Sequence, residues 1–319
     1  MTVLFRVAAG PRVGFGHLVR CRSLARALGV APRVVIRGNA TTRRRAASLG
    51  WQVVAGQASR LAVDRPALLV IDDPSAAAAA VWLRAARRLA IPVASLHDVG
   101  LAPVASQLSI DGSAGRTAAC GTIAALRGPR FAVLDPAVAA VRRRRGRTAS
   151  APSVLVALGG GSHARRGITA LVRALTAAAP GLEVRVAAGF TATSRHRLPA
   201  GRFVFAPAGL ATELARATVA VVGGGVTAYE ACALGVPAVV TAVVPAQQPT
   251  VAALARAGAV VAGGRFRSAG DARRLAGAIV RLLDDEARRR ALARRGRRLV
   301  DGRGALRVAA ALRRMAHAA

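Results

Sequence analysis

Short runs of valine, leucine, isoleucine and alanine alternate with helix-forming segments along the whole chain, and this alternation restricts the possible folds most. Continuous apolar runs separated by helices are typical of parallel strands that are covered on both faces. The expected strands are residues 3–7, 33–37, 52–55, 67–71, 92–96, 153–158, 183–188, 203–205, 219–222 and 238–241, with weaker signals at 107–110 and 130–134. The expected helices are residues 17–28, 41–49, 76–89, 166–178, 209–216, 227–234, 249–257, 272–283, 286–299 and 305–315. The chain is therefore predicted to have an α/β fold with parallel sheets.

A polar, basic segment without apolar periodicity, residues 141–150, suits an exposed linker near the middle of the chain. The 319 residues also fit two domains of ~150 residues each. We expect an N-terminal Rossmann-like domain over residues 1–147 and a C-terminal one over residues 148–319, which includes the terminal helices. Because ligands of such sheets bind at the carboxyl ends of the strands, a cleft between the domains is the expected site.

The net charge of +34 raises the question of a nucleic-acid partner. All 48 basic residues are arginine, however, and they are spread over helical segments. Aromatic residues make up only 3% of the chain, so the stacking platform of a single-strand reader is missing. We therefore expect no specific nucleic-acid partner, and only a weak, general attraction to anionic ligands and surfaces.

Cys21, Cys120 and Cys232 are odd in number and far apart, which is typical of reduced thiols. No secretory signal pattern stands at the N-terminus. The longest apolar run, residues 217–244, is interrupted by glycines, an acid and a proline, so it is not a membrane span. These features predict a cytoplasmic protein without a transmembrane segment.

The most informative segment for function begins at Gly14, where the chain reads GFGHLVRCRSLARAL directly after an expected strand. Gly14 and Gly16 bracket a phenylalanine, and His17 stands where the loop becomes a helix. A strand, glycine turn and helix let the backbone approach a ligand that faces the helix N–H groups. His17 titrates near neutrality, so it suits a general base. The alternative is a tight turn with a histidine that makes only a local hydrogen bond.

Two further glycine clusters stand at strand-to-helix junctions in the second half, where they suggest a surface for a diphosphate. Neither has the spacing of a P-loop or of a dinucleotide fingerprint. The five histidines lack the spacing of metal ligands, so we expect no metal and no other cofactor. The predicted binding residues in these clusters are Gly159, Gly160, Gly161, Ser162, Gly223, Gly224 and Gly225.

Four polar residues follow the second of these clusters. Thr227 suits either a helix cap or a donor to a phosphate oxygen. Glu230 either closes a capping box or accepts hydrogen bonds from ribose hydroxyls. Gln247 and Gln248 begin the next helix, where they either contact the nucleotide-sugar or lie on the surface.

Three further residues are candidates for the sugar side of the site. Asp72 and Asp98 each stand at a strand end, where they either orient His17 or the sugar, or cap the next turn. Arg20 lies one turn into the first helix and is a weaker candidate, because arginine is abundant throughout the chain.

The segments GFGHLVRCRSLARAL, GPRFAVLDP, LVALGGGS, GGGVTAYEACALGVP and DGRGALRV, together with the glutamine pair, occur in the order seen in one family. The chain resembles the UDP-sugar hydrolases of pseudaminic acid biosynthesis (PseG) and their spore-coat polysaccharide relatives, within the MurG-like GT-B glycosyltransferase superfamily. The resemblance implies a GT-B fold, with two doubly wound Rossmann-like domains facing across a cleft. It implies that His17 activates water, and that the second domain holds the nucleotide through Gly223, Gly224, Gly225, Thr227 and Glu230.

The chain departs from this family at residues 73–75 and at His163, mostly on the sugar-facing side. We therefore expect hydrolysis of a UDP-linked amino or deoxy sugar, of the UDP-diacetamido-trideoxy-altrose type, in surface-polysaccharide or nonulosonic acid biosynthesis. The alternative is a GT-B glycosyltransferase with a UDP-sugar donor. A third interpretation is a nucleotide-sugar binding protein without catalysis.

Overall fold

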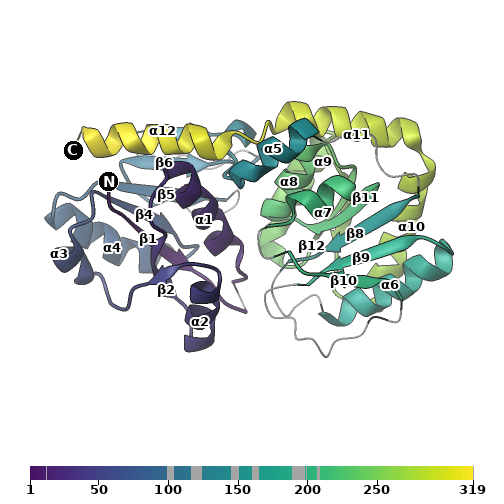
Figure 1. The fold of residues 1–319 in the computed structure, drawn as a ribbon, viewed down its shortest axis with the longest axis horizontal. Helices are drawn as coiled ribbons and strands as arrows, with labels where there is room; N and C mark the ends of the chain where they lie inside the picture. Colours follow the sequence, from purple (N-terminus) through teal and green to yellow (C-terminus); the bar gives the residue numbers. More distant parts are fainter. Residues whose placement is uncertain are drawn as a thin grey trace. The chain divides into compact units, whose positions relative to one another are not determined.

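The computed structural model describes residues 1–11, 13–98, 104–115, 124–144, 151–159, 165–188, 198, 200–206 and 209–318. The chain divides into two compact units (Figure 1). Unit 1 comprises Met1–Pro136 and Arg303–Ala319, and unit 2 comprises Ala137–Gly302. These units differ from the predicted domains of residues 1–147 and 148–319, because the chain crosses after Pro136 and because its last helix returns to unit 1.

Unit 1 is built on a seven-stranded sheet in the order β3-β2-β1-β4-β5-β6-β7. Every strand pair in it is parallel, and the central strands β1, β4 and β5 are buried along their whole length. Continuous aliphatic strands of this kind need cover on both faces. The strands are β1 (Val3–Ala8), β2 (Arg33–Arg37), β3 (Gln52–Val53), β4 (Leu68–Asp72), β5 (Val93–His97), β6 (Leu108–Asp111) and β7 (Ala124–Arg127).

Helices supply that cover. Helix α1 packs against β1 and against α12, which is the last helix of the chain. Helix α4 buries Trp82 and Leu83 in a core that it shares with Leu69 and Ile71 of β4. The helices of unit 1 are α1 (Gly16–Leu28), α2 (Ala40–Ser48), α3 (Arg60–Asp64), α4 (Ala76–Arg88), the 3-10 helix η1 (Pro129–Phe131) and α12 (Gly304–His317).

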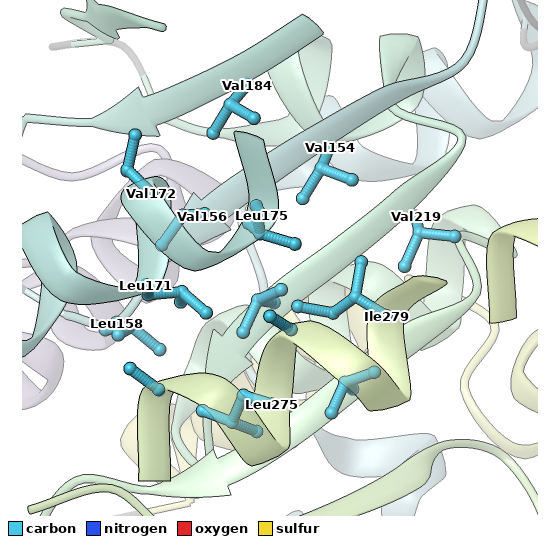
Figure 2. Close-up of a cluster of buried hydrophobic side chains, with 14 of the residues drawn as sticks. Val154, Val156, Leu158, Leu171, Val172, Leu175, Val184, Val219, Leu275 and Ile279 are labelled. Atoms are coloured by element: carbon cyan, nitrogen blue, oxygen red, sulfur yellow. The ribbon is translucent and has the colours of Figure 1, made fainter. Parts of the chain in front are cut away.

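Unit 2 is built on a six-stranded parallel sheet in the order β10-β9-β8-β11-β12-β13. Figure 2 shows aliphatic side chains of its strands packed against helices α6 and α10, with Val154, Leu175 and Ile279 in one cluster. The strands are β8 (Ser153–Ala157), β9 (Glu183–Ala187), β10 (Arg202–Val204), β11 (Val219–Gly223), β12 (Ala238–Ala242) and β13 (Val261–Arg265). The helices are α5 (Pro136–Arg144), α6 (Arg165–Ala178), α7 (Ala211–Arg216), α8 (Val226–Leu234), η3 (Pro245–Gln247), α9 (Gln248–Arg256), α10 (Ala269–Asp284) and α11 (Glu286–Leu299).

The predicted α/β fold with parallel sheets is confirmed, but individual elements differ. The strand predicted at 130–134 is wrong, because the segment opens with η1 at Pro129, and proline has no N–H for a strand ladder. Strand β13 was not predicted, since its sequence VAGGR has the weak strand preference of a glycine pair. In the part of the chain that the structure describes, no helix is both long and apolar enough to cross a membrane.

Candidate active site

Three neighbouring strands of unit 1 end in a titratable residue. Asp72 is the last residue of β4, His97 the last of β5 and Asp111 the last of β6. Because the strands are parallel, all three residues stand at the carboxyl edge of the sheet, where doubly wound folds bind ligands. Helix α1 begins at Gly16 and follows β1, so its first turn places His17 at the same edge.

His17 and Asp72 form the centre of this site. The Nδ1 atom of His17 lies 2.7 Å from Oδ1 of Asp72, and the histidine side chain is 14% exposed while the aspartate side chain is 1% exposed. An ionised carboxylate only accepts hydrogen bonds, so Nδ1 carries the proton and donates it to Asp72. Nε2 is then the lone-pair nitrogen, and it forms no hydrogen bond within the described residues. This arrangement is a base oriented by an acid.

The pKa of His17 is raised from its ordinary value. Burial of the ring by itself lowers this pKa, because a buried cation loses hydration, but the charge and hydrogen bond of Asp72 more than offset the effect. The ring therefore gains a proton more readily than a free histidine does, which favours its role as a base.

Arg20 holds the acidic side of this site in place. Its Nε atom lies 2.9 Å from Oδ2 of Asp72 and its Nη2 atom 2.7 Å from Oδ1, which is a bidentate pair. Its Nη1 atom lies 2.5 Å from Oδ1 of Asp98, whose side chain is 42% exposed. Burial raises the pKa of Asp72, but the charges of Arg20 and His17 outweigh it and the net pKa is lowered. The charge of Arg20 is thus neutralised by two carboxylates, which leaves it a positioning residue rather than a phosphate ligand.

The neighbouring carboxylate, Asp73, belongs to a different cluster. It accepts two hydrogen bonds from Arg37, at 2.8 and 2.5 Å, and pairs with buried Arg6 at 3.3 Å. Successive side chains of a strand point to opposite faces, so Asp72 and Asp73 diverge at the end of β4. Asp73 therefore has a structural role, which accounts for one of the positions where the chain departs from the resembled family.

In unit 2, the predicted loop Gly223–Gly225 connects β11 to α8. A Cβ atom at Gly224 would lie 2.9 Å from a methyl group of Val251 and 3.0 Å from the backbone oxygen of Gln247, so only glycine fits there without a shift. Gly225 is the N-cap of α8, and no side chain caps that helix. The backbone N–H groups of the first turn are thus not occupied by a capping side chain.

The polar residues near this loop are placed as follows. Thr227 lies inside the first turn of α8 and Gly225 is the N-cap, so the interpretation of Thr227 as a helix cap is wrong. A capping box needs its acid at the third helical position, which is Ala228, so the interpretation of Glu230 as a capping-box acid is also wrong. Glu230 is 6% exposed. Gln247 accepts a hydrogen bond from the backbone N–H of Val243 at 2.9 Å, which holds its side chain beside the glycine loop, whereas Gln248 is exposed.

The remaining predicted residues add less to the description of the site. Gly14 forms an isolated bridge with Gly10, and Gly16 is the first residue of α1. Gly159 follows β8 in a left-handed conformation, with φ of 99°. Gly160, Gly161, Ser162 and Cys120 lie outside the described residues. Cys21 and Cys232 are buried free thiols, and burial raises the pKa of Cys232 to about 12.

The structure brings His17, Arg20, Asp72 and Asp98 together in unit 1. In unit 2, Gln247 lies beside the glycine loop, Thr227 follows the loop in the first turn of α8, and Glu230 is buried further along that helix. His97 and Asp111 were not among the residues predicted from the sequence. The sequence did contain a signal for them, because each directly follows an expected strand, as Asp72 does. Among the described residues, no group of three or more His, Cys, Asp or Glu side chains is arranged to hold a metal ion.

Comparisons with known proteins define the fold class. No protein-family model and no curated protein matches the sequence. The spinosyn rhamnosyltransferase SpnG in complex with thymidine diphosphate is similar over 99% of this chain and 100% of its own, with a TM-score of 0.66 and 18% identity. MurG of Acinetobacter baumannii is similar over 98% of this chain and 100% of its own, with a TM-score of 0.68 and 14% identity.

A third similar structure is the UDP-GlcNAc 2-epimerase of Neisseria meningitidis bound to UDP-GlcNAc. It has a TM-score of 0.60 and 12% identity, and covers 98% of this chain and 100% of its own. Likeness at such low identity defines the fold alone. The chain therefore has the GT-B fold, with one parallel α/β sheet in each of two units.

Proposed function

We propose that this chain hydrolyses a UDP-linked amino or deoxy sugar at its anomeric carbon and releases UDP and the free sugar. The observation that carries the proposal is the His17–Asp72 pair, with Nδ1 donating to the carboxylate at 2.7 Å and Nε2 left as the base. A base oriented in this way at the carboxyl edge of a parallel sheet suits activation of a water molecule at a bound ligand.

In the proposed reaction, His17 Nε2 takes a proton from the water as its oxygen bonds to the anomeric carbon. The bond from that carbon to the diphosphate oxygen breaks, and its electron pair leaves with UDP. Asp72 stays ionised and stabilises the imidazolium that forms, as Arg20 keeps its pKa low. Asp98, which is held by the same arginine and partly exposed, suits a hydrogen bond from a sugar hydroxyl.

The nucleotide is assigned to unit 2. No side chain caps the start of α8, and the N–H groups of Val226 and Thr227 suit the negative charge that grows on the leaving diphosphate. Buried Glu230 in the same helix suits the ribose hydroxyls, and the resemblance to the UDP-sugar hydrolases assigns it that role. Gln247 is held beside the glycine loop and suits a contact to the phosphates or the sugar.

A GT-B glycosyltransferase is the second candidate, since SpnG is a rhamnosyltransferase by name and has the same fold. The chemistry at His17 would be unchanged, with an acceptor hydroxyl in place of water. An acceptor requirement separates the two candidates.

The test is release of UDP from a panel of UDP-sugars, first without any acceptor. We expect release by the unaltered protein, and a fall of about 10²- to 10⁴-fold in kcat for His17→Ala with little change in affinity for UDP. His317→Ala, in an exposed position at the end of α12, is the matched control and should keep full activity. Glu230→Ala should weaken UDP binding instead.

Three outcomes would contradict the proposal. Unchanged turnover in His17→Ala would remove the catalytic assignment, and UDP release that appears only after an acceptor is added would replace hydrolysis with transfer. Binding of UDP-sugars with no turnover under either condition would favour a protein without catalysis.

A further inference from the structure

A compact block of buried polar side chains lies on one face of strands β5 and β6. Ser95 is paired in register with Ser109, and His97 with Asp111, so the four side chains form two rows on the same face of the sheet. All four are buried, with exposed fractions between 1% and 6%. Strands in the interior of such a sheet ordinarily present aliphatic residues here, because a buried polar group without a partner costs free energy.

A chain of hydrogen bonds sets the protonation of His97. The Ser106 hydroxyl donates to the backbone oxygen of Leu108 at 2.9 Å, so Ser106 Oγ can only accept from Ser95, at 2.6 Å. Ser95 has then used its single proton, and it must accept from Nε2 of His97 at 2.7 Å. Nε2 therefore carries the proton, and Nδ1 is left as an acceptor with no hydrogen bond within the described residues. Burial lowers the pKa of His97, which keeps the ring neutral.

Asp111, the register partner of His97, likewise has an acceptor atom that receives no hydrogen bond within the described residues. Its Oδ1 atom accepts a hydrogen bond from the backbone N–H of Ser113 at 2.9 Å. Its Oδ2 atom is fully buried and has no hydrogen-bond partner among the residues that the structure describes. A buried carboxylate oxygen without a donor is costly, so it calls for a partner. Burial also raises the pKa of this carboxyl group.

At the carboxyl edge of the sheet, two polar atoms on adjacent strand ends thus have no hydrogen-bond partner in the described part of the chain. The block lies one strand away from Asp72, and the charges of Arg20 and Asp98 act on both His97 and Asp111. His97 and Asp111 are the last residues of their strands, so the block ends at the edge of the sheet where doubly wound folds bind ligands.

We propose that His97 and Asp111 form a polar subsite for hydrogen-bond donors of the substrate's sugar, hydroxyls or an acylamino N–H. The inference rests on the proposed function and assigns its sugar-side recognition to residues beyond His17 and Asp98. A hydroxyl hydrogen or an amide hydrogen supplies the donor that each atom lacks, one hydrogen for each atom. A site built to bond such a group discriminates strongly against sugars without it, since the buried atoms would remain unpaired.

The test compares the affinities for UDP and for UDP-N-acetylglucosamine by titration calorimetry, in the His17→Ala background to prevent turnover. In Asp111→Asn the amide oxygen must stay toward the Ser113 N–H, so an NH₂ group replaces the Oδ2 acceptor. In His97→Gln the amide nitrogen can keep the bond to Ser95, but nothing replaces Nδ1. Ser109→Ala, in the same block but one row away from the edge, is the matched control.

We expect both variants to raise the ratio of the UDP-N-acetylglucosamine Kd to the UDP Kd by about 5- to 100-fold. The UDP affinity itself should stay unchanged, and Ser109→Ala should leave the ratio unchanged. An unchanged ratio in the folded variants would overturn the subsite while leaving the proposed function intact. Failure of the parent protein to bind either UDP or the UDP-sugar would overturn the proposed function, and the subsite with it. If Asp111→Asn does not fold, His97→Gln decides the outcome.

Discussion

At the scale of single residues, two adjacent aspartates have separate roles because strand geometry turns them apart. Asp72 accepts a hydrogen bond from His17 of α1 and orients its ring, whereas Asp73 forms ion pairs with Arg6 and Arg37. The sequence identified Asp72, Asp98, Arg20 and His17 as candidates from their positions at strand ends and in the first helical turn. It did not reveal that Arg20 joins both acids, because that contact depends on which face of the sheet α1 covers.

The pH dependence of turnover tests the His17–Asp72 pair. The base must be neutral, so kcat/KM should fall as the pH drops through the raised pKa of His17. Asp72→Asn removes the charge that raises this pKa and leaves burial and Arg20, which both lower it. The acid limb should therefore move to lower pH, and the plateau should fall by about 10²- to 10⁴-fold as the ring loses its orientation.

Asp98→Asn is the comparison variant, since Asp98 also raises the pKa of His17 but as the smallest of the contributions. Its acid limb should move in the same direction by less. An acid limb that stays in place or moves to higher pH in Asp72→Asn would refute the assignment of His17 as the base.

At the scale of elements, the sequence located most strands and helices but not all their roles. Residues 141–150 lack apolar periodicity and were predicted to be a linker, yet Arg142 lies in α5 and donates to the backbone oxygens of Ala233, Arg297 and Val300. A guanidinium that satisfies three carbonyl oxygens near helix ends stabilises the packing of α5 in unit 2. Such a contact depends on distant backbone, so periodicity alone does not predict it.

The start of α12 tests how tightly that helix is seated. A Cβ atom added at Gly304 would overlap the backbone oxygen and nitrogen of Ala132, and backbone cannot move aside as a flexible side chain can. Gly304→Ala should therefore lower the free energy of unfolding by about 1–3 kcal/mol, measured in urea. Gly270→Ala, in the first turn of α10, meets nothing closer than a side-chain oxygen at 3.6 Å and should raise it by about 0.5–1 kcal/mol. Equal effects of the two substitutions would contradict close seating of α12 on Ala132.

At the scale of the whole molecule, the sequence predicted two Rossmann-like domains but assigned the last helix to the wrong one. The amphipathic pattern of residues 304–317 shows that α12 has an apolar face, without indicating which surface covers it. In the structure α12 packs on α1 and η1, and Arg313 donates to the backbone oxygens of Ala27 and Leu28 at the end of α1. Unit 1 is therefore discontinuous in sequence, and a linear search for a domain boundary misses its second segment.

Truncation after Gly302 tests this assignment, because it should destabilise unit 1 and leave unit 2 folded. Val308 and Leu312 are fully buried, and burial of two such side chains contributes roughly 3–6 kcal/mol, a large part of the stability of a domain. Both tryptophans of the chain, Trp51 and Trp82, are buried in unit 1, so tryptophan fluorescence reports on unit 1 alone. In the truncated protein, the thermal unfolding transition seen by tryptophan fluorescence should move to a lower temperature. Far-UV circular dichroism should retain a second unfolding transition, from unit 2. If instead the tryptophan transition stayed in place and the other moved, α12 would belong with unit 2.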